Sequence, residues 1–365
     1  MSGDADERPT RVNRDDVTRT LTICLLGFGN VGRRFCELVG RKEDELARDH
    51  ALRVRFAAVG TGSHGSLLAP GGLTAAETLA IAGGDGLELM FPDPPRPGVE
   101  LIEACDADVL IEATPLDPLG GHAAIEHIEA AFAHGMDVVT VNKGPIAWAY
   151  RRLAGLATAA GCGFRFEGTV MDGAPVFNMW ESCLPGCRLL GFDAVFNSTT
   201  NFILDAMGEG VGFADALAQV QADGYAETEP SHDIDGHDAA AKTAALANVL
   251  MDARITPDDV VKESIRDVTP ERVEAALRAG RRLRVLCTAF SASLPAQGTA
   301  SPGVRASVRL VELPPEHPFY SVGGSSLSVI LHTDLMGDLE VAERTGLPDQ
   351  TAYAIYSDLL ALSRR

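Results

Sequence analysis

Residues 224–242, GYAETEPSHDIDGHDAAAK, place five carboxylic acids, two histidines and a lysine immediately before a run of helix-forming residues. Asp238 and Lys242 are four positions apart, so a helix would hold them on one face. An ammonium group held by a carboxylate can stabilise negative charge on a substrate oxygen and supply its proton. The alternative is an ordinary surface ion pair, because exposed pairs are common and weak. Residues of types that favour a helix N-cap precede this pair: Ser231, Asp233 and Asp235.

The two histidines of this stretch raise a second alternative, a transition-metal site. Residues 232–238 read HDIDGHD, so His232 and His237 lie five positions apart. That spacing does not put both rings on one helical face, and the segment spans the expected start of a helix. We therefore expect proton chemistry here rather than metal binding.

An earlier glycine-rich loop predicts a nucleotide cofactor. Leu21–Leu26 is a short apolar run typical of a buried strand, and GFGNVG and a helical pattern follow it. In such a strand, loop and helix, Gly27 makes the tight turn, Gly29 lets the backbone approach a pyrophosphate and Gly32 lets the helix pack closely. The expected cofactor-binding residues of this loop are Gly27, Phe28, Gly29, Asn30, Val31 and Gly32.

The end of the second expected strand bears on the choice between NAD and NADP. Val54–Val59 leads into GTGSHG, which lacks the acidic residue that usually holds the ribose 2′-hydroxyl of NAD. Small polar residues with Arg33 and His64 near them would tolerate a 2′-phosphate, and Ser63 would contact the ribose or simply form a turn. The sequence leans towards NADP and leaves NAD open.

A second lysine follows another expected strand. Asp108–Glu112 reads as a buried strand that carries Thr114 at its carboxyl end, where nucleotide-binding folds place their ligands. Asp137–Val141 is the next strand, and Lys143 comes directly after it. We expect Lys143 to face the cofactor cleft, with a generic surface lysine as the alternative. Pro145 would then open the next helix.

Ser66–Gly98, in the first half of the chain, is rich in glycine and proline and holds one expected short helix. The second half has a different pattern, and a polar, flexible loop is expected over residues 167–173. From Phe164 onward, apolar runs and alternating patterns predict a second, half-exposed sheet, followed by a terminal helix over Thr351–Leu362. The expected strands are Phe164–Phe166, Leu189–Phe196, Val285–Phe290, Val304–Leu310 and Leu327–Leu331.

Composition excludes several classes of function. The net charge of −20 argues against nucleic acid and anionic membranes as partners, because phosphate binding needs clustered lysine and arginine. The polar N-terminus does not resemble a signal peptide, and no apolar run approaches the length that spans a bilayer. The seven scattered cysteines are typical of reduced thiols, so we expect a cytoplasmic protein.

These motifs, in this order, resemble the homoserine dehydrogenase family over nearly the whole chain. The matching stretches are GFGNVG at 27–32, EAT at 112–114, VTVNKGP at 139–145, EGTVMDGAPVF at 167–177, NSTTNFIL at 197–204, residues 224–242 and TAYAIYSDL at 351–359. The resemblance implies an α/β fold with an N-terminal Rossmann-type nucleotide-binding domain and an α+β substrate and dimerisation domain. The implied bounds are a tail at 1–18, the nucleotide domain at 19–163 joined by 335–365, and the second domain at 164–334.

The resemblance also implies a reaction and a role for each matching residue. The family reduces L-aspartate 4-semialdehyde to L-homoserine with NADPH or NADH, in the branch of biosynthesis that leads to threonine, methionine and isoleucine, and works as a homodimer. Lys242 matches the proton donor, Lys143 the second active-site lysine and Asp238 the acidic partner. The substrate-side positions are Glu227, Asp233, Thr199 and Tyr225. Gly346 falls in the C-terminal cofactor segment, and a sodium or potassium ion would lie at Glu167, Val170, Asp172 and Ala174.

Departures from the family pattern keep other functions open. Ser198 replaces a glycine, and Met171 and Asp172 stand where small residues are usual, which crowds the substrate and cation loops. One alternative is therefore a related NAD(P)-dependent reductase acting on another amino-acid semialdehyde or a 2-amino-alcohol. A non-catalytic nucleotide-binding regulator is another, and the lysines and Asp238 argue against it.

Overall fold

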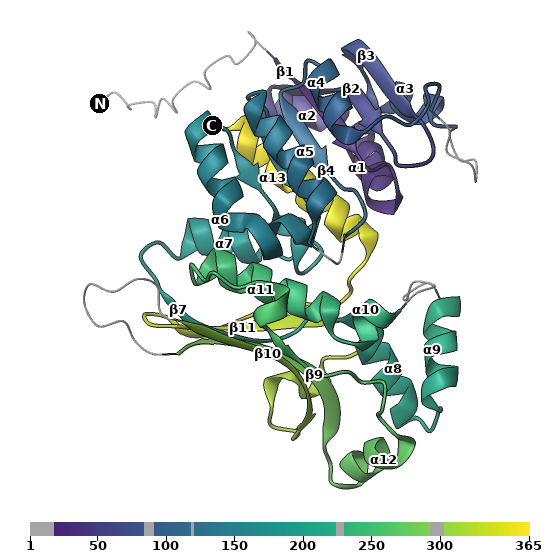
Figure 1. Ribbon diagram of the computed structural model, residues 1–365, viewed down its shortest axis with the longest axis vertical. Coiled ribbons are helices and arrows are strands. Elements are labelled where there is room, and N and C mark those ends of the chain that lie inside the picture. Colours follow the sequence, from purple (N-terminus) through teal and green to yellow (C-terminus); the bar gives the residue numbers. More distant parts are fainter. Residues whose placement is uncertain (1–17, 84–90, 118–119, 224–229, 293–302) are drawn as a thin grey trace, which may run out of the picture.

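The computed structural model describes residues 18–83, 91–117, 120–223, 230–292 and 303–365. Two six-stranded sheets organise the chain, one in each half, with helices packed around them (Figure 1). Within the described residues, no helix combines the length and apolar character needed to cross a membrane.

The first sheet has the strand order β3-β2-β1-β4-β5-β6, and all neighbours are parallel except β2 and β3. This is the order of a dinucleotide-binding sheet, in which the order reverses between β1 and β4 and leaves a crevice at their carboxyl ends. The strands are β1 (Arg19–Leu26), β2 (Leu52–Gly60), β3 (Ser66–Leu73), β4 (Val109–Glu112), β5 (Asp137–Thr140) and β6 (Phe164–Arg165).

Alternating residues of β1 bury both faces of this sheet. Ile23 and Leu25 join the cluster that holds α1 (Asn30–Arg41) and α13 (Pro348–Ser363), whereas Cys24 and Leu26 face the helices on the other side. Those helices are α4 (Gly98–Ala104), α5 (His122–Ala133) and α6 (Lys143–Ala160). Two shorter helices, α2 (Glu43–His50) and α3 (Ala75–Ile81), follow α1 and β3.

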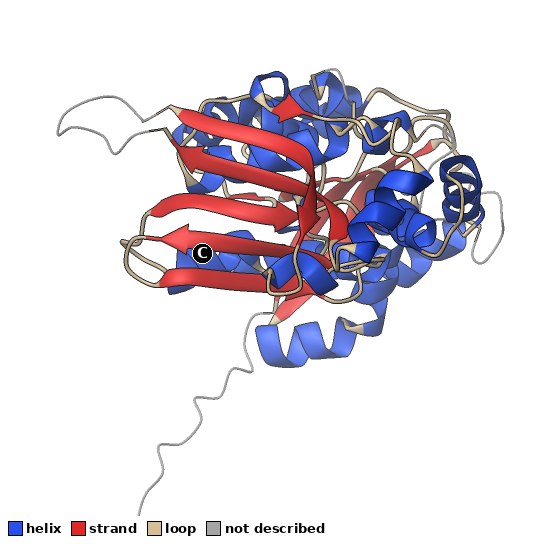
Figure 2. Cartoon of the chain, turned by 90° about the horizontal axis from the view of Figure 1, so that it is seen from below, coloured by secondary structure: helices blue, strands red, loops and turns tan. Residues whose placement is uncertain are grey.

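The second sheet has the order β12-β11-β7-β9-β10-β8 and is antiparallel apart from the β8–β10 pair. Helix α11 (His237–Leu250) lies between this sheet and α6 (Figure 1), and its alanines, among them Ala240, Ala244 and Ala247, are fully buried. The strands lie in front of the helices in Figure 2. They are β7 (Leu189–Val195), β8 (Val261–Lys262), β9 (Arg282–Ser291), β10 (Val304–Leu313), β11 (Leu327–Thr333) and β12 (Gly337–Glu343).

The remaining helices lie around the second sheet. They are α7 (Val176–Cys183), α8 (Ser198–Gly208), α9 (Phe213–Ala222), α10 (Ser231–Ile234) and α12 (Pro270–Arg278), with 3₁₀ turns at Glu167–Thr169, Pro257–Asp259 and Pro318–Ser321. Helix α8 begins at Ser198, so Thr199 belongs to its first turn and does not precede it.

Three expected segment assignments were wrong. Ser66–Gly98 holds strand β3 as well as α3, because its apolar start pairs with β2. Phe164 does not open the second domain, since β6 pairs with β5 in the first sheet. Residues 335–347 do not return to the first domain, because β12 alternates apolar Leu339 and Val341 with exposed residues and pairs with β11. The returning element is α13.

The helix starts near the lysines also differ from expectation. Gly236, and none of the predicted side chains, caps α11, with a left-handed φ of 77° that glycine adopts readily. Ser231 starts the separate helix α10, and Asp235 pairs with Arg266. Helix α6 starts at Lys143, so Pro145 is its third residue. The missing N–H of the proline costs little there, because N–H groups in the first turn have no acceptor within the helix.

Candidate active site

The two lysines of the predicted site meet on one carboxylate. Lys143 Nζ lies 2.9 Å from Asp238 Oδ1, and Lys242 Nζ lies 3.3 Å from Asp238 Oδ2. Lys242 also donates to the carbonyl oxygen of Phe196 at 2.9 Å. All three charged side chains are at least 80% shielded from solvent, with exposures of 20%, 13% and 15% for Lys143, Asp238 and Lys242. The arrangement is therefore not the surface ion pair that the spacing alone allowed.

Each member of this cluster comes from the start of a helix. Lys143 is the first residue of α6, and Asn142 caps that helix by accepting from the Gly144 N–H at 3.0 Å. Asp238 lies in the first turn of α11 with Lys242 one turn later. Backbone and cap geometry thus fix where both ammonium groups point.

The charges of the cluster support one another. Burial disfavours the Asp238 carboxylate, but the two ammonium groups outweigh it and hold the pKa of Asp238 well below its ordinary value. Burial likewise disfavours the Lys242 ammonium, yet Asp238, Asp172 and Asp233 together raise the pKa of Lys242. Lys242 therefore carries a positive charge at neutral pH.

Asn197 is a site residue that the sequence reasoning did not single out. Its Oδ1 accepts from the Thr200 N–H at 2.8 Å and caps α8. Its Nδ2 then faces the acids, donating to Asp233 Oδ1 at 2.7 Å and to Asp238 Oδ2 at 3.1 Å. An asparagine at a strand end before a helix signals a cap, but no pattern in the sequence could show which acids its amide would meet.

The substrate-side residues of the prediction divide into two groups. Asp233 lies beside the cluster, and its pKa is raised above the ordinary value. Burial and the charge of Asp238 raise it, and they outweigh the hydrogen bonds from Asn197 and Thr199, which lower it. Thr199 is buried in the first turn of α8. Glu227 and Tyr225 lie outside the described residues.

The glycine-rich loop forms the backbone cradle expected of a dinucleotide site. A Cβ on Gly27, at φ +93°, would lie 2.1 Å from the Ala113 oxygen, and one on Gly32 would lie 2.0 Å from the Gly27 oxygen. A Cβ on Gly29 would meet no atom of the described chain within 4 Å. Gly29 also begins α1 without a side-chain cap, and Asn30 to Arg33 include no acid. A helix start open in this way fits a pyrophosphate.

A cavity of about 360 Å³ lies beside this cradle, at the carboxyl ends of β1 and β2. Its lining includes Thr114, as predicted from the strand end, and the end of β2 with the turn after it, residues 60–62, where an NAD-selective site usually carries an acid and this chain has none. All three groups expected near the ribose have local partners: Ser63 Oγ lies 2.8 Å from His64 Nδ1, and Arg33 pairs with Glu37 at 3.2 Å.

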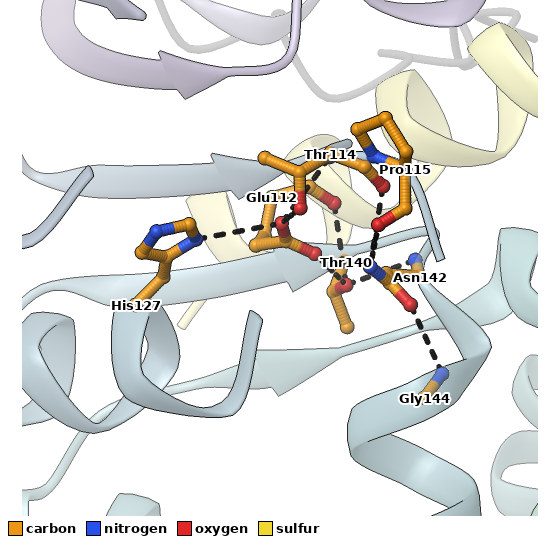
Figure 3. A network of polar contacts seen from close by, with 7 residues as sticks. All are labelled: Glu112, Thr114, Pro115, His127, Thr140, Asn142 and Gly144. Carbon is orange, nitrogen blue, oxygen red and sulfur yellow. Dashed lines mark hydrogen bonds and ion pairs between the residues drawn. The ribbon is translucent and has the colours of Figure 1, made fainter. Parts of the chain in front are cut away.

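A buried carboxylate links the wall of this cavity to the start of α6 (Figure 3). Glu112, fully buried at the end of β4, accepts from the Thr114 N–H at 3.2 Å and from Thr140 Oγ1 at 3.1 Å. The Asn142 N–H donates to Thr140 Oγ1 at 3.0 Å, and its amide donates to the Thr114 carbonyl at 3.2 Å. His127 approaches Glu112 from α5 at 3.7 Å. The network holds the cavity wall and the residue before Lys143 in one rigid unit.

The predicted cation loop is a buried turn, and the expectation of a flexible polar loop was wrong. Glu167 is 3% exposed because its carboxylate accepts the N–H groups of Phe177 at 2.9 Å and Asn178 at 2.6 Å, at the start of α7. Burial raises the pKa of Glu167 to about 7. Val170 and Ala174 are also buried. Among the described residues, no group of three histidine, cysteine, aspartate or glutamate side chains could hold a metal ion.

Asp172 brings the predicted cation loop against the segment around Gly346, for which the sequence predicts a cofactor contact. It has a left-handed φ of 43°, uncommon for a residue other than glycine. Its Oδ1 accepts from Thr351 Oγ1 at 3.3 Å, and its Oδ2 would lie 2.4 Å from a Cβ on Gly346. Burial and then Asp172 raise the pKa of Glu343 to about 7. Asp172 therefore adds negative charge between the Gly346 segment and Lys242.

Comparisons with known proteins agree with this geometry. A family profile described as "Homoserine dehydrogenase" matches residues 175–360, and one described as "Homoserine dehydrogenase, NAD binding domain" matches residues 27–167. The chain belongs to the homoserine dehydrogenase family. It is accordingly an NAD(P)-dependent oxidoreductase that acts on a CH–OH group.

Individual members of the family cover most of the chain. An NAD(+)-dependent homoserine dehydrogenase from Pseudomonas canavaninivorans is 33% identical over 93% of this chain and 95% of its own. A crystal structure of a homoserine dehydrogenase from Thiobacillus denitrificans has a TM-score of 0.78 at 25% identity and covers 95% of this chain and 74% of that one. A hyperthermophilic archaeal homoserine dehydrogenase in complex with NADPH has a TM-score of 0.76 at 25% identity, covering 95% and 98%.

Proposed function

We propose that this chain catalyses the reversible reduction of L-aspartate 4-semialdehyde to L-homoserine with NAD(P)H. The observation that carries the proposal is the pair of ammonium groups, from Lys143 and Lys242, on the buried Asp238 carboxylate. The backbone cradle at Gly27–Gly32 and the network through Asn142 support it, because they hold the cofactor cleft and the cluster in one unit.

Lys242 is the proton donor in this proposal. The bound cofactor supplies the hydride that reduces the aldehyde carbon. Lys242 Nζ–H then gives its proton to the aldehyde oxygen, so that the carbonyl becomes a hydroxyl group and the lysine is left neutral until it takes a proton from solvent. Asp238 holds Lys242 charged and oriented, and Lys143 adds a second positive group that stabilises the developing oxyanion.

The acids around the cluster suit an amino-acid substrate. Asp233 and Glu227 would accept from the substrate ammonium, and Thr199 and Tyr225 would donate to its carboxylate. Met171 and Asp172 stand where the family pattern has small residues, so a related semialdehyde reductase is the second candidate. Side-by-side kcat/KM values for L-homoserine and its longer and shorter analogues separate the two.

The cation, assembly and location form the rest of the proposal. A sodium or potassium ion would be held by backbone carbonyls of the turn that includes Glu167, Val170, Asp172 and Ala174, because the Glu167 carboxylate is already used by α7. We infer a homodimer in the cytoplasm, acting on small molecules in amino-acid biosynthesis. NADP is the favoured cofactor, since no acid stands at the end of the second strand or in the turn that follows it, residues 60–65.

Oxidation of L-homoserine, assayed with NAD and NADP in parallel and with or without added potassium or sodium, tests the proposal. We expect substrate-dependent absorbance at the reduced-nicotinamide band, faster with NADP and faster with the cation. Reduction that requires another semialdehyde would replace this substrate with the second candidate. No turnover with any amino-alcohol would favour the non-catalytic regulator.

A further inference from the structure

The segment Phe91–Gly98 closes one side of the cavity at the end of β2; it reads FPDPPRPG. Pro95, Arg96, Pro97 and Gly98 line the cavity together with Gly60, Thr61 and Gly62. Arg96 lines the cavity and is permanently charged, as arginine is in proteins. Among the residues that the structure describes, no acid lines the cavity. The sequence reasoning treated this segment only as a connection rich in proline.

Backbone hydrogen bonds fix the segment to the turn after β2. The Phe91 N–H donates to the His64 carbonyl at 2.8 Å, and Ser66 and Asp93 exchange backbone bonds at 2.8 and 3.2 Å. Gly65 packs so closely that a Cβ there would lie 2.7 Å from the Phe91 and Asp93 carbonyl oxygens. The position of Arg96 relative to Gly62 is therefore set by the fold.

The segment is also tied to the pyrophosphate cradle and is locally stiff. The Phe91 ring packs edge-on against Phe28 of the glycine-rich loop, with ring centroids 5.2 Å apart. Arg96 stands between Pro95 and Pro97, and a residue before proline is restricted to extended backbone. Arg96 thus lines the cavity from a constrained backbone.

We propose that Arg96 binds the 2′-phosphate of the adenosine ribose and makes this chain selective for NADP(H). An acid at the end of the second strand would hold a free 2′-hydroxyl, whereas a nearby arginine accommodates a 2′-phosphate. Here the strand end and the turn after it, residues 60–62, carry no acid, and Arg96 supplies a cation in the lining of the same cavity. Guanidinium and phosphate form paired, charge-assisted hydrogen bonds, which are stronger than neutral ones. The inference rests on the proposed cofactor binding and assigns its selectivity to one residue.

Binding of two small adenosine ligands tests this assignment without any turnover. Adenosine 2′,5′-bisphosphate and adenosine 5′-monophosphate differ only in the 2′-phosphate, and calorimetry measures the dissociation constant of each. We expect the wild-type chain to bind the bisphosphate about 10- to 100-fold more tightly. Arg96→Met should remove most of that ratio and leave binding of the monophosphate nearly unchanged.

Matched variants separate a phosphate contact from other effects. Arg53→Met removes an exposed arginine near the opposite end of β2 and should leave the ratio intact. Arg96→Lys should keep part of the ratio, because a single ammonium replaces a bidentate group. Equal binding of both ligands by the wild-type chain would overturn the proposal. So would a ratio that Arg96→Met leaves unchanged, or an equal loss for both ligands, which would place Arg96 on the adenine.

The outcome is independent of the substrate. If the chain prefers the bisphosphate but does not oxidise L-homoserine, the proposed reaction fails and the assignment of Arg96 stands. If it oxidises L-homoserine with NAD and binds both ligands equally, the assignment fails and the reaction stands.

Discussion

The cofactor cradle and the lysine cluster are built from different materials. The cradle consists of backbone, because Gly27 and Gly32 leave no room for side chains and Gly29 faces open space. The cluster consists of charged side chains that are mostly buried and satisfy one another around Asp238. The cradle should therefore tolerate changes in charge but not in shape, whereas the cluster should respond to the loss of a single charge.

The largest expected combined loss of activity and stability comes from Asp238→Asn. The change removes the carboxylate that pairs with both ammonium groups, so Lys143 loses its ion-pair partner and Lys242 loses a charge that raises its pKa. We expect kcat to fall roughly 100-fold and the free energy of unfolding to fall by about 3 kcal/mol. Steady-state kinetics and urea denaturation measure the two.

Asp235→Asn is the matched control for this variant. Asp235 lies three positions earlier and pairs with Arg266 at 2.7 Å in a solvent-exposed bridge. Its loss should cost no more than about 1 kcal/mol and leave kcat near that of the wild type. Similar losses in both variants would show that the Asp238 effect is a general response of this helix start.

A smaller effect is expected when the cradle changes shape. Gly29→Ala places a methyl group in the open space before α1, so folding should be unaffected while the dissociation constant of NADP rises at least about tenfold. Gly32→Ala instead forces a Cβ against the Gly27 oxygen and should lower the melting temperature. Fluorescence titration and thermal unfolding distinguish these outcomes. Unchanged NADP binding by Gly29→Ala would remove this loop from the cofactor site.

How far the sequence predicted each region follows from the same difference. GFGNVG restricts the backbone locally, so strand, turn and helix were predictable from the order of glycines alone. The Asp238–Lys242 pair was predictable from its spacing on a helix. Lys143 follows a strand much earlier in the chain, and the sequence does not show how far it lies from Asp238. Asn197 was missed because its partners come from α10 and α11, and only tertiary packing brings them together. In β12, apolar Leu339 and Val341 alternate with polar residues, and this pattern in the sequence is typical of a strand at the edge of a sheet.

The smallest effect tests the charge that Asp172 adds to the cluster. Asp172 helps to raise the pKa of Lys242, so Asp172→Asn should lower that pKa. Homoserine oxidation needs the neutral amine as a base, and therefore the acidic limb of its kcat profile should move to lower pH, by less than about one pH unit. An unchanged limb, or a move to higher pH, would mean that Asp172 does not act on Lys242.

Lys242→Ala tests the central claim most directly, through two measurements on the same purified variant. The claim is that Lys242 supplies the proton while a separate cradle holds the cofactor. We predict a kcat for L-homoserine oxidation that is roughly 10²- to 10⁴-fold lower, together with a dissociation constant for NADPH equal to that of the wild-type chain. An undiminished kcat would contradict the claim, and an equal loss of NADPH binding would show that the two regions are not separate.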